Sequence, residues 1–177
     1  MISVLVLGSS TAAGRRPTSS DSVRTLAALV PGAVDGLVRD VVLVATTADA
    51  ELAKVADYAG CSFVAEPDFA RSLQVGAARA RSEQILILLA GVSFDRALID
   101  EMAGLASRHS GWLEGGVGVK SVETGWFGRI MPSLVPTVGL VVLRKHLTGV
   151  SADSFQALQR QVRPRRTFKT RAWAGGD

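Results

Sequence analysis

The segment Gly8–Ser20 contains the residue types that bind phosphate groups in proteins. Its glycines and serines can present backbone N–H groups to an anion, and its arginines add positive charge. The residues that could contact a phosphate are Gly8, Ser9, Ser10, Gly14, Arg15 and Arg16. The segment follows an apolar run, and doubly wound sheets bind ligands at that place. A solvent-exposed loop without a ligand is the alternative interpretation.

The spacing within this segment differs from the common phosphate-binding motifs. It has no Gly-Lys-Ser/Thr, so it is not a P-loop, and no Gly-x-Gly-x-x-Gly. It resembles in part the glycine- and arginine-containing loop of nucleotidyltransferases that activate sugars or molybdopterin, but no lysine follows at the expected place. A nucleotidyltransferase-like function is therefore a further alternative.

The histidines and the cysteine form no metal-binding or nucleophilic pattern. His109 and His146 are the only histidines, and they are widely separated in the chain. Cys61 is the only cysteine, so no intramolecular disulfide can form, which fits a reducing compartment. Neither a zinc site nor a Ser-His-Asp triad is predicted.

Short apolar runs alternate with helical patterns through the first 110 residues. Strands that are apolar throughout have both faces covered, and strands separated by helices form βαβ units. The runs predicted to be strands are Ile2–Leu7, Val41–Val44, Cys61–Ala65 and Ile85–Leu89. We therefore predict an α/β fold of three layers, α/β/α, with a mostly parallel central sheet.

The first predicted helix shows how the segments between strands are interpreted. Asp21 or Ser20 can cap its N-terminus, and Pro31-Gly32 is predicted to end it. Its apolar positions have the spacing of one helical face. They are Val23, Leu26, Ala27 and Val30.

The pattern is less regular after residue 110. Gly115–Val122 and Thr137–Leu143 are predicted strands, and Ala152–Val162 is a last helix that Pro164 stops. No internal repeat or linker interrupts the chain. Residues 1–177 are therefore predicted to be one domain, with a regular part at 1–110 and a less regular part at 111–177.

Basic residues are concentrated near the C-terminus of a chain with a net charge of +4 and a pI of 9.8. They are Arg160, Arg163, Arg165, Arg166, Lys169 and Arg171. A solvated, frayed tail is the preferred interpretation. The alternative is a weak contact of the stretch 160–171 with an anionic membrane surface. Nucleic-acid binding is not predicted, because no motif for it is present.

The distribution of apolar residues predicts a soluble, cytoplasmic protein. No apolar run approaches the roughly 20 residues that a membrane-spanning helix needs. The apolar start Met1–Gly8 is too short for a signal peptide, and no basic residue precedes it.

Four stretches match the pattern of one enzyme family. They are Thr25–Leu29 with Gly36–Val44, Gly76–Ala80, Ile85–Met102 and Val138–Arg144. Together they resemble bacterial family 2 glycosyltransferases of the GT-A fold, the fold of nucleotide-diphospho-sugar transferases. The resemblance covers most of the chain and implies a nucleotide-sugar ligand. It implies that 1–110 is the nucleotide-binding half, that 111–177 is the acceptor-side half, and that Ala45, Thr46 and Arg144 lie in the nucleotide site.

The chain departs from that family at the carboxylates. The family ends its second strand with an aspartate that reads the nucleotide base, whereas this chain has Ala45 and then Thr46. The family's Asp-X-Asp motif holds a divalent metal, whereas this chain has Leu89-Ala90-Gly91, whose side chains offer no oxygen ligand. Asp95 is predicted to be a helix N-cap, with a metal ligand as the alternative. A divalent metal cofactor is therefore not expected.

Asp153 is the candidate catalytic residue that the resemblance implies. The family's catalytic base is an Asp or Glu at the start of a late helix, and Asp153 occupies that place with Ala152 beside it. A carboxylate there can deprotonate an acceptor hydroxyl. It can also stabilise the N-terminus of the helix Ala152–Val162, and this structural role is the preferred interpretation.

These features favour a glycosyltransferase-like protein without a standard metal site. Arginines and helix N-termini would then stabilise the charge of the leaving diphosphate. The alternative is a degenerate, non-catalytic pseudoenzyme that binds a ligand, a protein partner or a second copy of itself. Loss of three acidic positions is what relaxed selection on catalysis would produce, while the packing pattern keeps the fold.

Overall fold

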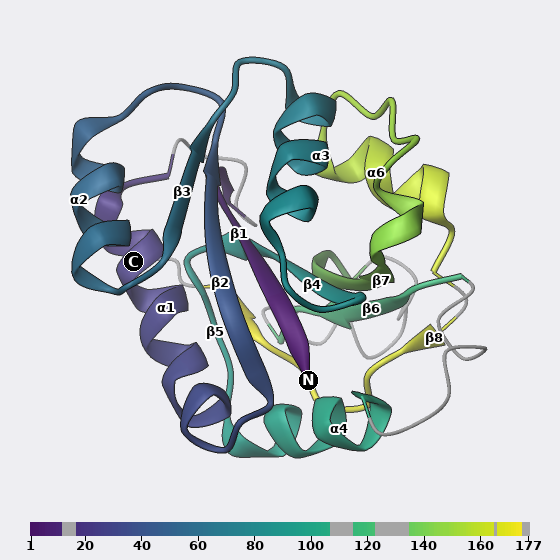
Figure 1. Ribbon diagram of the computed structural model, residues 1–177. Coiled ribbons are helices and arrows are strands. Elements are labelled where there is room, and N and C mark those ends of the chain that lie inside the picture. Colours follow the sequence, from purple (N-terminus) through teal and green to yellow (C-terminus); the bar gives the residue numbers. More distant parts are fainter. Residues whose placement is uncertain (12–16, 107–114, 123–134, 165, 175–177) are drawn as a thin grey trace.

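The computed structural model describes residues 1–11, 17–106, 115–122, 135–164 and 166–174 (Figure 1). A seven-stranded sheet has the order β3-β2-β1-β4-β7-β6-β8, and β5 pairs separately with β9. The strands are β1 (Ile2–Thr11), β2 (Val38–Ala45), β3 (Ser62–Ala65), β4 (Gln84–Ala90), β5 (Val92–Ser93), β6 (Val117–Lys120), β7 (Thr137–Leu143), β8 (Arg166–Thr167) and β9 (Trp173–Ala174). The helices are α1 (Ser19–Val34), α2 (Ala50–Tyr58), α3 (Phe69–Arg79), α4 (Arg96–Ala106), the 3-10 turn η3 (Arg144–His146) and α6 (Phe155–Val162).

The prediction of a mostly parallel sheet between two helical layers is confirmed. Strands β1 to β4 are mutually parallel where they pair, and β7 runs antiparallel to both β4 and β6. Helix α1 contacts both α2 and α4 on one face, and α3 lies on the other face beside α6 (Figure 1). The strand interiors are buried on both faces, as their unbroken apolar sequences require.

Strand β1 is longer than predicted. It continues through Gly8 and Ser9 to Thr11, which pairs with Ala90 after a break in register. The first four residues of the supposed loop Gly8–Ser20 are therefore strand. Pairing with β4 supplies partners for these backbone groups, a long-range contact that local composition does not reveal.

Helix α1 presents a different face to the sheet than predicted. Its buried residues are Asp21, Ser22, Thr25, Leu29 and Gly32. Small and polar side chains let the helix approach closely, and a Cβ at Gly32 would lie 3.2 Å from Val38 Cγ2. The predicted apolar positions Val23 and Val30 are instead 49% and 55% exposed.

The predicted ends of α1 are also corrected. Its N-cap is Thr18, with Asp21 in the first turn, and the helix passes through Pro31 to Val34. A proline inside a helix removes one backbone hydrogen bond and normally ends it. Gly32, the next residue, is buried, and its carbonyl oxygen accepts a hydrogen bond from the N–H of Leu37 at 2.9 Å.

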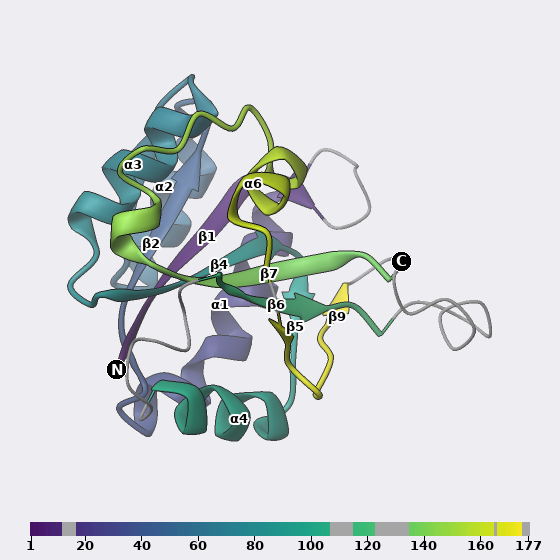
Figure 2. The ribbon, with the colours of Figure 1, turned by 90° about the vertical axis from the view of Figure 1, so that its right-hand side faces the viewer.

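The C-terminal basic stretch is not a frayed tail. After α6 the chain adds β8 beside β6 and then turns back to β9, as Figure 2 shows. Phe168 and Ala172 are buried, and their N–H groups donate to the carbonyl oxygens of Gly118 and Lys120 at 3.0 and 2.9 Å. The sequence interpretation failed because two buried side chains are hidden among many charged ones.

No helix in the described part of the chain is long and apolar enough to cross a membrane.

Glu101 on α4 fixes the turn between β8 and β9. Its two carboxylate oxygens accept hydrogen bonds from the N–H groups of Lys169 and Thr170 at 2.8 and 2.9 Å. Burial alone would raise the pKa of Glu101, but the two backbone hydrogen bonds, the Thr170 side chain and the charge of Lys169 outweigh it and lower the pKa. The folded state therefore favours the ionised carboxylate.

Replacing Glu101 with glutamine is expected to destabilise the protein at neutral pH but not in acid. A carboxyl with a lowered pKa contributes stability above its unfolded pKa of about 4.3, and this stability is lost as the pH falls through the folded-state pKa. Urea unfolding at about pH 7 and at steps down to about pH 2 measures how the difference falls with pH. Asp100→Asn on the same helix is the control, because Asp100 forms only an exposed ion pair with Arg96. A difference between wild type and Glu101→Gln that does not change with pH would contradict the prediction.

Candidate functional site

The parallel strands β1, β2, β3 and β4 end at one edge of the sheet. Leu7 pairs with both Val44 and Leu89, so the residues that follow these positions lie at the same level. The strand order reverses between β1 and β4, because β2 lies on one side of β1 and β4 on the other. Open α/β sheets bind ligands outside the carboxyl ends of the strands at such a point.

A cleft of about 390 Å³ lies at this edge. It is lined by Ser9, Thr46, Pro67, Asp68, Phe69, Asp153 and Ser154. Three residues singled out in the sequence, Ser9, Thr46 and Asp153, therefore lie around one cavity. They come from the end of β1, from the residue after β2 and from the approach to α6.

The N-termini of two helices face this cleft. Asp68 caps α3 by accepting a hydrogen bond from the N–H of Arg71 at 2.7 Å. Ser154 caps α6 by accepting one from the N–H of Ala157 at 3.3 Å. Each N-terminus carries a partial positive charge of about half a unit, a feature of anion-binding sites, and the carboxylates of Asp68 and Asp153 add negative charge to the same cleft.

The helix-capping role expected of Asp153 belongs to its neighbour. Helix α6 starts at Phe155 rather than Ala152, and Ser154 is its N-cap. Asp153 is exposed, and its Oδ1 accepts a hydrogen bond from Ser154 Oγ at 3.0 Å. Its carboxylate lies at the cleft, where it can accept a proton from a bound hydroxyl.

The end of β4 does not provide a metal site. Leu89 and Ala90 are buried, and Gly91 has a φ of +84°. A Cβ built on Gly91 would lie 3.2 Å from Asp21 Oδ1. The groups at this place therefore do not fit the oxygen-rich shell of a divalent cation.

Sequence reasoning identified Asp21 only as a helix cap and did not expect it at the end of β4. Asp21 is 3% exposed, and its Oδ2 accepts hydrogen bonds from Thr18 N and Thr18 Oγ1 at 2.8 and 2.9 Å. Its backbone carbonyl accepts from the N–H of Gly91 at 3.0 Å. No local pattern reveals this contact, because it depends on α1 starting beside the end of β4.

Asp68 was also missed, although its position carries a signal. An aspartate directly before the apolar-periodic segment that begins at Phe69 is a typical N-cap. Such a residue follows β3 and so lies at the ligand-binding edge.

Asp95 lies away from the cleft. Its Oδ1 accepts a hydrogen bond from the N–H of Leu98 at 3.2 Å, which confirms the predicted capping role. The next residue, Arg96, forms an ion pair at 2.8 Å with Asp35, beyond the C-terminal end of α1. This end of α1 is beside the start of β1, so the alternative role of Asp95 as a metal ligand near Gly91 has no geometric support.

Arg144 also lies at the opposite edge of the sheet. Because β7 is antiparallel to β4, Leu143 pairs with Gln84 at the start of β4. The Arg144 guanidinium donates through Nη2 to the carbonyl oxygen of Ser82 at 2.7 Å. The structure therefore does not bring Arg144 together with Ser9 and Thr46.

The remaining predicted residues are placed as follows. Gly8 is buried in β1, Ser10 is part of the same strand, and Ala45 is buried at the end of β2. Gly14, Arg15, Arg16 and His109 lie outside the described residues. Within the described ranges, no three His, Cys, Asp or Glu side chains are grouped so that they could hold a metal ion.

No protein-family model matches the chain, and no curated protein matches it. Solved structures do match. Glucosyl-3-phosphoglycerate synthase from Mycobacterium tuberculosis, in complex with Mn²⁺, UDP and phosphoglyceric acid, has a TM-score of 0.65 at 13% identity, over 100% of this chain and 71% of that chain. A mannosyltransferase from Pyrobaculum calidifontis, in complex with GDP-Man and Mn²⁺, has a TM-score of 0.63 at 14% identity, over 96% of this chain and 54% of that chain.

A third similar structure is HddC from Yersinia pseudotuberculosis complexed with GMP-PN. Its TM-score is 0.53 at 10% identity, over 88% of this chain and 82% of that chain. At these identities the comparisons show a shared fold. They confirm the predicted glycosyltransferase-like GT-A architecture of this chain.

Proposed function

We propose that the cleft at the strand ends binds a nucleotide-sugar and that the protein is a family 2-like glycosyltransferase without the standard metal site. The observation that carries the proposal is the convergence of Ser9, Thr46 and Asp153 with two helix N-termini in one cavity. The structural neighbours whose complexes contain UDP or GDP-Man support the choice of ligand class.

The proposed donor contacts replace carboxylates with hydroxyl groups and helix N-termini. Ala45 is buried, so the first polar side chain after β2 that reaches the cleft is Thr46. Its hydroxyl would contact the nucleoside, and the N-termini of α3 and α6 would stabilise the diphosphate as it leaves. No step requires a metal ion at Leu89-Ala90-Gly91.

Asp153 is the proposed catalytic base. Its carboxylate would accept the proton of the acceptor hydroxyl as the acceptor oxygen bonds to the anomeric carbon of the sugar. The bond from that carbon to the diphosphate oxygen breaks, and the electron pair leaves with the nucleoside diphosphate. The exposed position of Asp153 at the mouth of the cleft leaves room for an acceptor.

A second candidate is a binding protein of the same fold that no longer catalyses transfer. The observation that favours it is the apolar, closely packed end of β4, where Gly91 lies against Asp21. Only the first candidate requires both nucleotide binding and turnover.

Calorimetric titration with UDP, GDP, CDP and their common sugar conjugates, each with and without Mn²⁺, tests the proposal. We expect one nucleotide to bind with an affinity that Mn²⁺ changes by less than about threefold, equivalent to about 0.65 kcal/mol. Thr46→Val is expected to weaken binding about 5- to 10-fold, as loss of one hydrogen bond does. The matched control is Thr47→Val, which changes an exposed neighbour that does not line the cleft.

Absence of binding under every condition would overturn the first candidate and would favour a non-catalytic protein that binds another partner. Binding without transfer to any acceptor would select the non-catalytic one. An equal loss of affinity in Thr46→Val and Thr47→Val would place the nucleotide elsewhere.

A further inference from the structure

Helix α1 exposes a stripe of apolar side chains with coiled-coil spacing. Val23, Ala27, Val30 and Val34 are all exposed, the three valines by 49%, 55% and 81%. Their separations of four, three and four residues repeat the a and d positions of a heptad. Side chains with this spacing form one continuous seam along the helix, and a second helix can pack into it.

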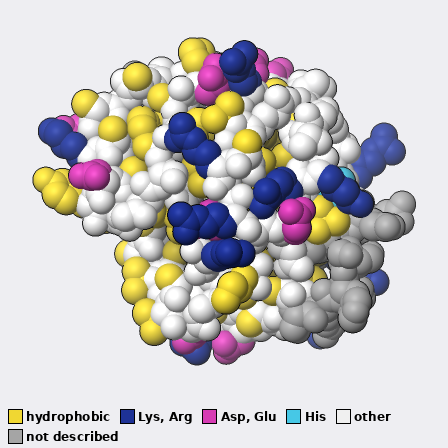
Figure 3. Space-filling model, viewed as in Figure 1, with side chains coloured by type: hydrophobic (Ala, Val, Ile, Leu, Met, Phe, Trp, Pro, Cys, Tyr) yellow, Lys and Arg dark blue, Asp and Glu magenta, His cyan; other side chains and the backbone are white. Residues whose placement is uncertain are grey.

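A hollow beside this stripe enlarges the apolar surface. It has a volume of about 480 Å³ between α1 and α2, and Leu26, Ala33, Val55 and Tyr58 are among its lining residues. Tyr58 is 89% exposed at the end of α2. Figure 3 shows hydrophobic side chains along the flank that α1 forms. We call the stripe and this hollow the α1 face.

The α1 face lacks the charges that cover the outer side of a surface helix. Between Ser22 and Val34, Arg24 is the one charged residue of α1. The shorter α2 carries Glu51, Lys54 and Asp57 on its exposed side. A helix that is apolar on its outer side as well as its inner side normally packs against a further partner.

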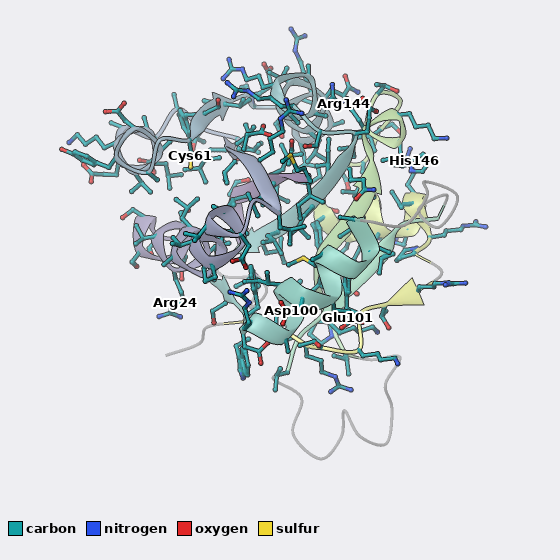
Figure 4. All side chains as sticks on the ribbon, turned by 60° about the horizontal axis from the view of Figure 1, so that its bottom comes forward. Arg24, Cys61, Asp100, Glu101, Arg144 and His146 are labelled. Carbon is teal, nitrogen blue, oxygen red and sulfur yellow. The ribbon has the colours of Figure 1, made fainter. Side chains whose placement is uncertain are left out.

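The charges at the two ends of α1 are complementary to each other. Arg24 lies in the N-terminal half, points outward in Figure 4 and forms no ion pair with the described residues. The acidic group just beyond the C-terminal end consists of Asp35 and Asp100, which both contact Arg96. The helix dipole has the same polarity, positive at the N-terminus and negative at the C-terminus.

We propose that the α1 face binds a second copy of this chain, with the two α1 helices antiparallel about a two-fold axis. In this register Val23 meets Val34 of the second copy, and Ala27 meets its Val30. At 100° per residue, Arg24 and Asp35 are rotated from the stripe by about 90° and 110° in the same direction. A two-fold axis between antiparallel helices places the same flank of both helices on one side of the interface. Arg24 of each copy therefore lies beside the acidic group of the other.

The size of the α1 face fits an interface that includes both helices. Helix α1 has 16 residues and is about 24 Å long. A typical stable interface buries roughly 800 Å² per partner, which is more surface than the stripe alone offers. The hollow and Tyr58 widen the surface on the side opposite Arg24. The cleft at the strand ends lies outside this surface, so the interface leaves the proposed nucleotide site open.

Analytical ultracentrifugation of the full chain over a concentration series tests the proposal. We expect a reversible dimer, and we expect Val30→Glu to weaken it at least about 10-fold, because a charge at the centre of the seam must be desolvated. The matched control is Val122→Glu, which places the same charge at a valine that is 37% exposed in a different part of the chain and should leave the dimer intact.

The charge complementarity has its own test. Arg24→Glu is expected to weaken the dimer several-fold, with the effect reduced at high salt, whereas Arg24→Lys keeps the charge and should keep the dimer. Circular dichroism of each variant checks that the fold is retained, which is expected because the substituted side chains are exposed.

A monomer at all concentrations would overturn the proposal, as would a dimer that Val30→Glu and Val122→Glu affect equally. Binding of a monomeric chain to vesicles of phosphatidylcholine and phosphatidylglycerol, abolished by Val30→Glu, would identify a membrane surface as the partner and would also overturn it.

Discussion

Replacing Asp153 with asparagine is expected to lower the rate of sugar transfer by about 10²- to 10⁴-fold, the usual contribution of a general base. Asparagine keeps the size of the side chain but cannot accept the proton of the acceptor hydroxyl. Binding of the nucleotide is expected to change less than about twofold, because the base acts on the acceptor. Steady-state transfer kinetics and nucleotide titration on the same preparation measure the two quantities.

The control for this variant is Asp49→Asn. Asp49 caps α2 by accepting hydrogen bonds from the N–H groups of Glu51 and Leu52 at 2.8 and 3.3 Å, away from the cleft. Asparagine is an equally good N-cap, so transfer and stability should both be unchanged. Thermal unfolding separates the interpretations further, since Ser154 rather than Asp153 caps α6. An Asp153→Asn protein that is destabilised but transfers sugar normally would show that the residue is structural.

Replacing Gly91 with aspartate is expected to destabilise the protein by about 2–4 kcal/mol rather than to restore a metal site. The φ of +84° is costly for any residue with a Cβ, and the new carboxylate would be forced against Asp21, which is 3% exposed. For a chain of this size the melting temperature should fall by roughly 5–15 °C. Calorimetric titration with Mn²⁺ should show no gain in binding.

Gly36→Asp separates the two causes of this loss. Gly36 has a φ of +71°, but a Cβ there would meet no atom within 4 Å. Its substitution therefore has the backbone cost alone, about 1 kcal/mol. Equal destabilisation of the two variants would show that the contact between Gly91 and Asp21 has no energetic effect. A Mn²⁺-dependent nucleotide affinity in Gly91→Asp would show that the end of β4 can still accept a metal.

Several elements were predictable because local chemistry decides them. Short apolar runs between helical patterns, such as Ile85–Leu89, are typical of buried strands. The caps at Asp49 and Asp95 follow from side chains that reach backbone N–H groups two or three residues away. The alternation of strands and helices requires parallel pairing, and the matching neighbours share the resulting fold. These signals depend on residues within one or two turns of each other, so a single sequence contains them.

The choice of buried face on α1 was not predictable from periodicity. The apolar pattern indicates the face with Val23 and Val30, whereas the buried face combines Leu29 and Gly32 with small and polar side chains. The sheet accepts the face with smaller side chains, because close approach to Val38 is possible there. A helical pattern therefore identified the element but not its orientation.

The sequence by itself determined the fold class, the absence of side-chain oxygens in Leu89-Ala90-Gly91 and the candidates Ser9, Thr46 and Asp153. Only the tertiary structure decided which candidates meet. Ser9, Thr46 and Asp153 line one cleft. Arg144 lies at the opposite edge of the sheet, and Asp21 lies against Gly91. The physical reason is that strand order and register are set by burial summed over the whole sheet, so contacts between distant segments leave no signal at the residues that make them.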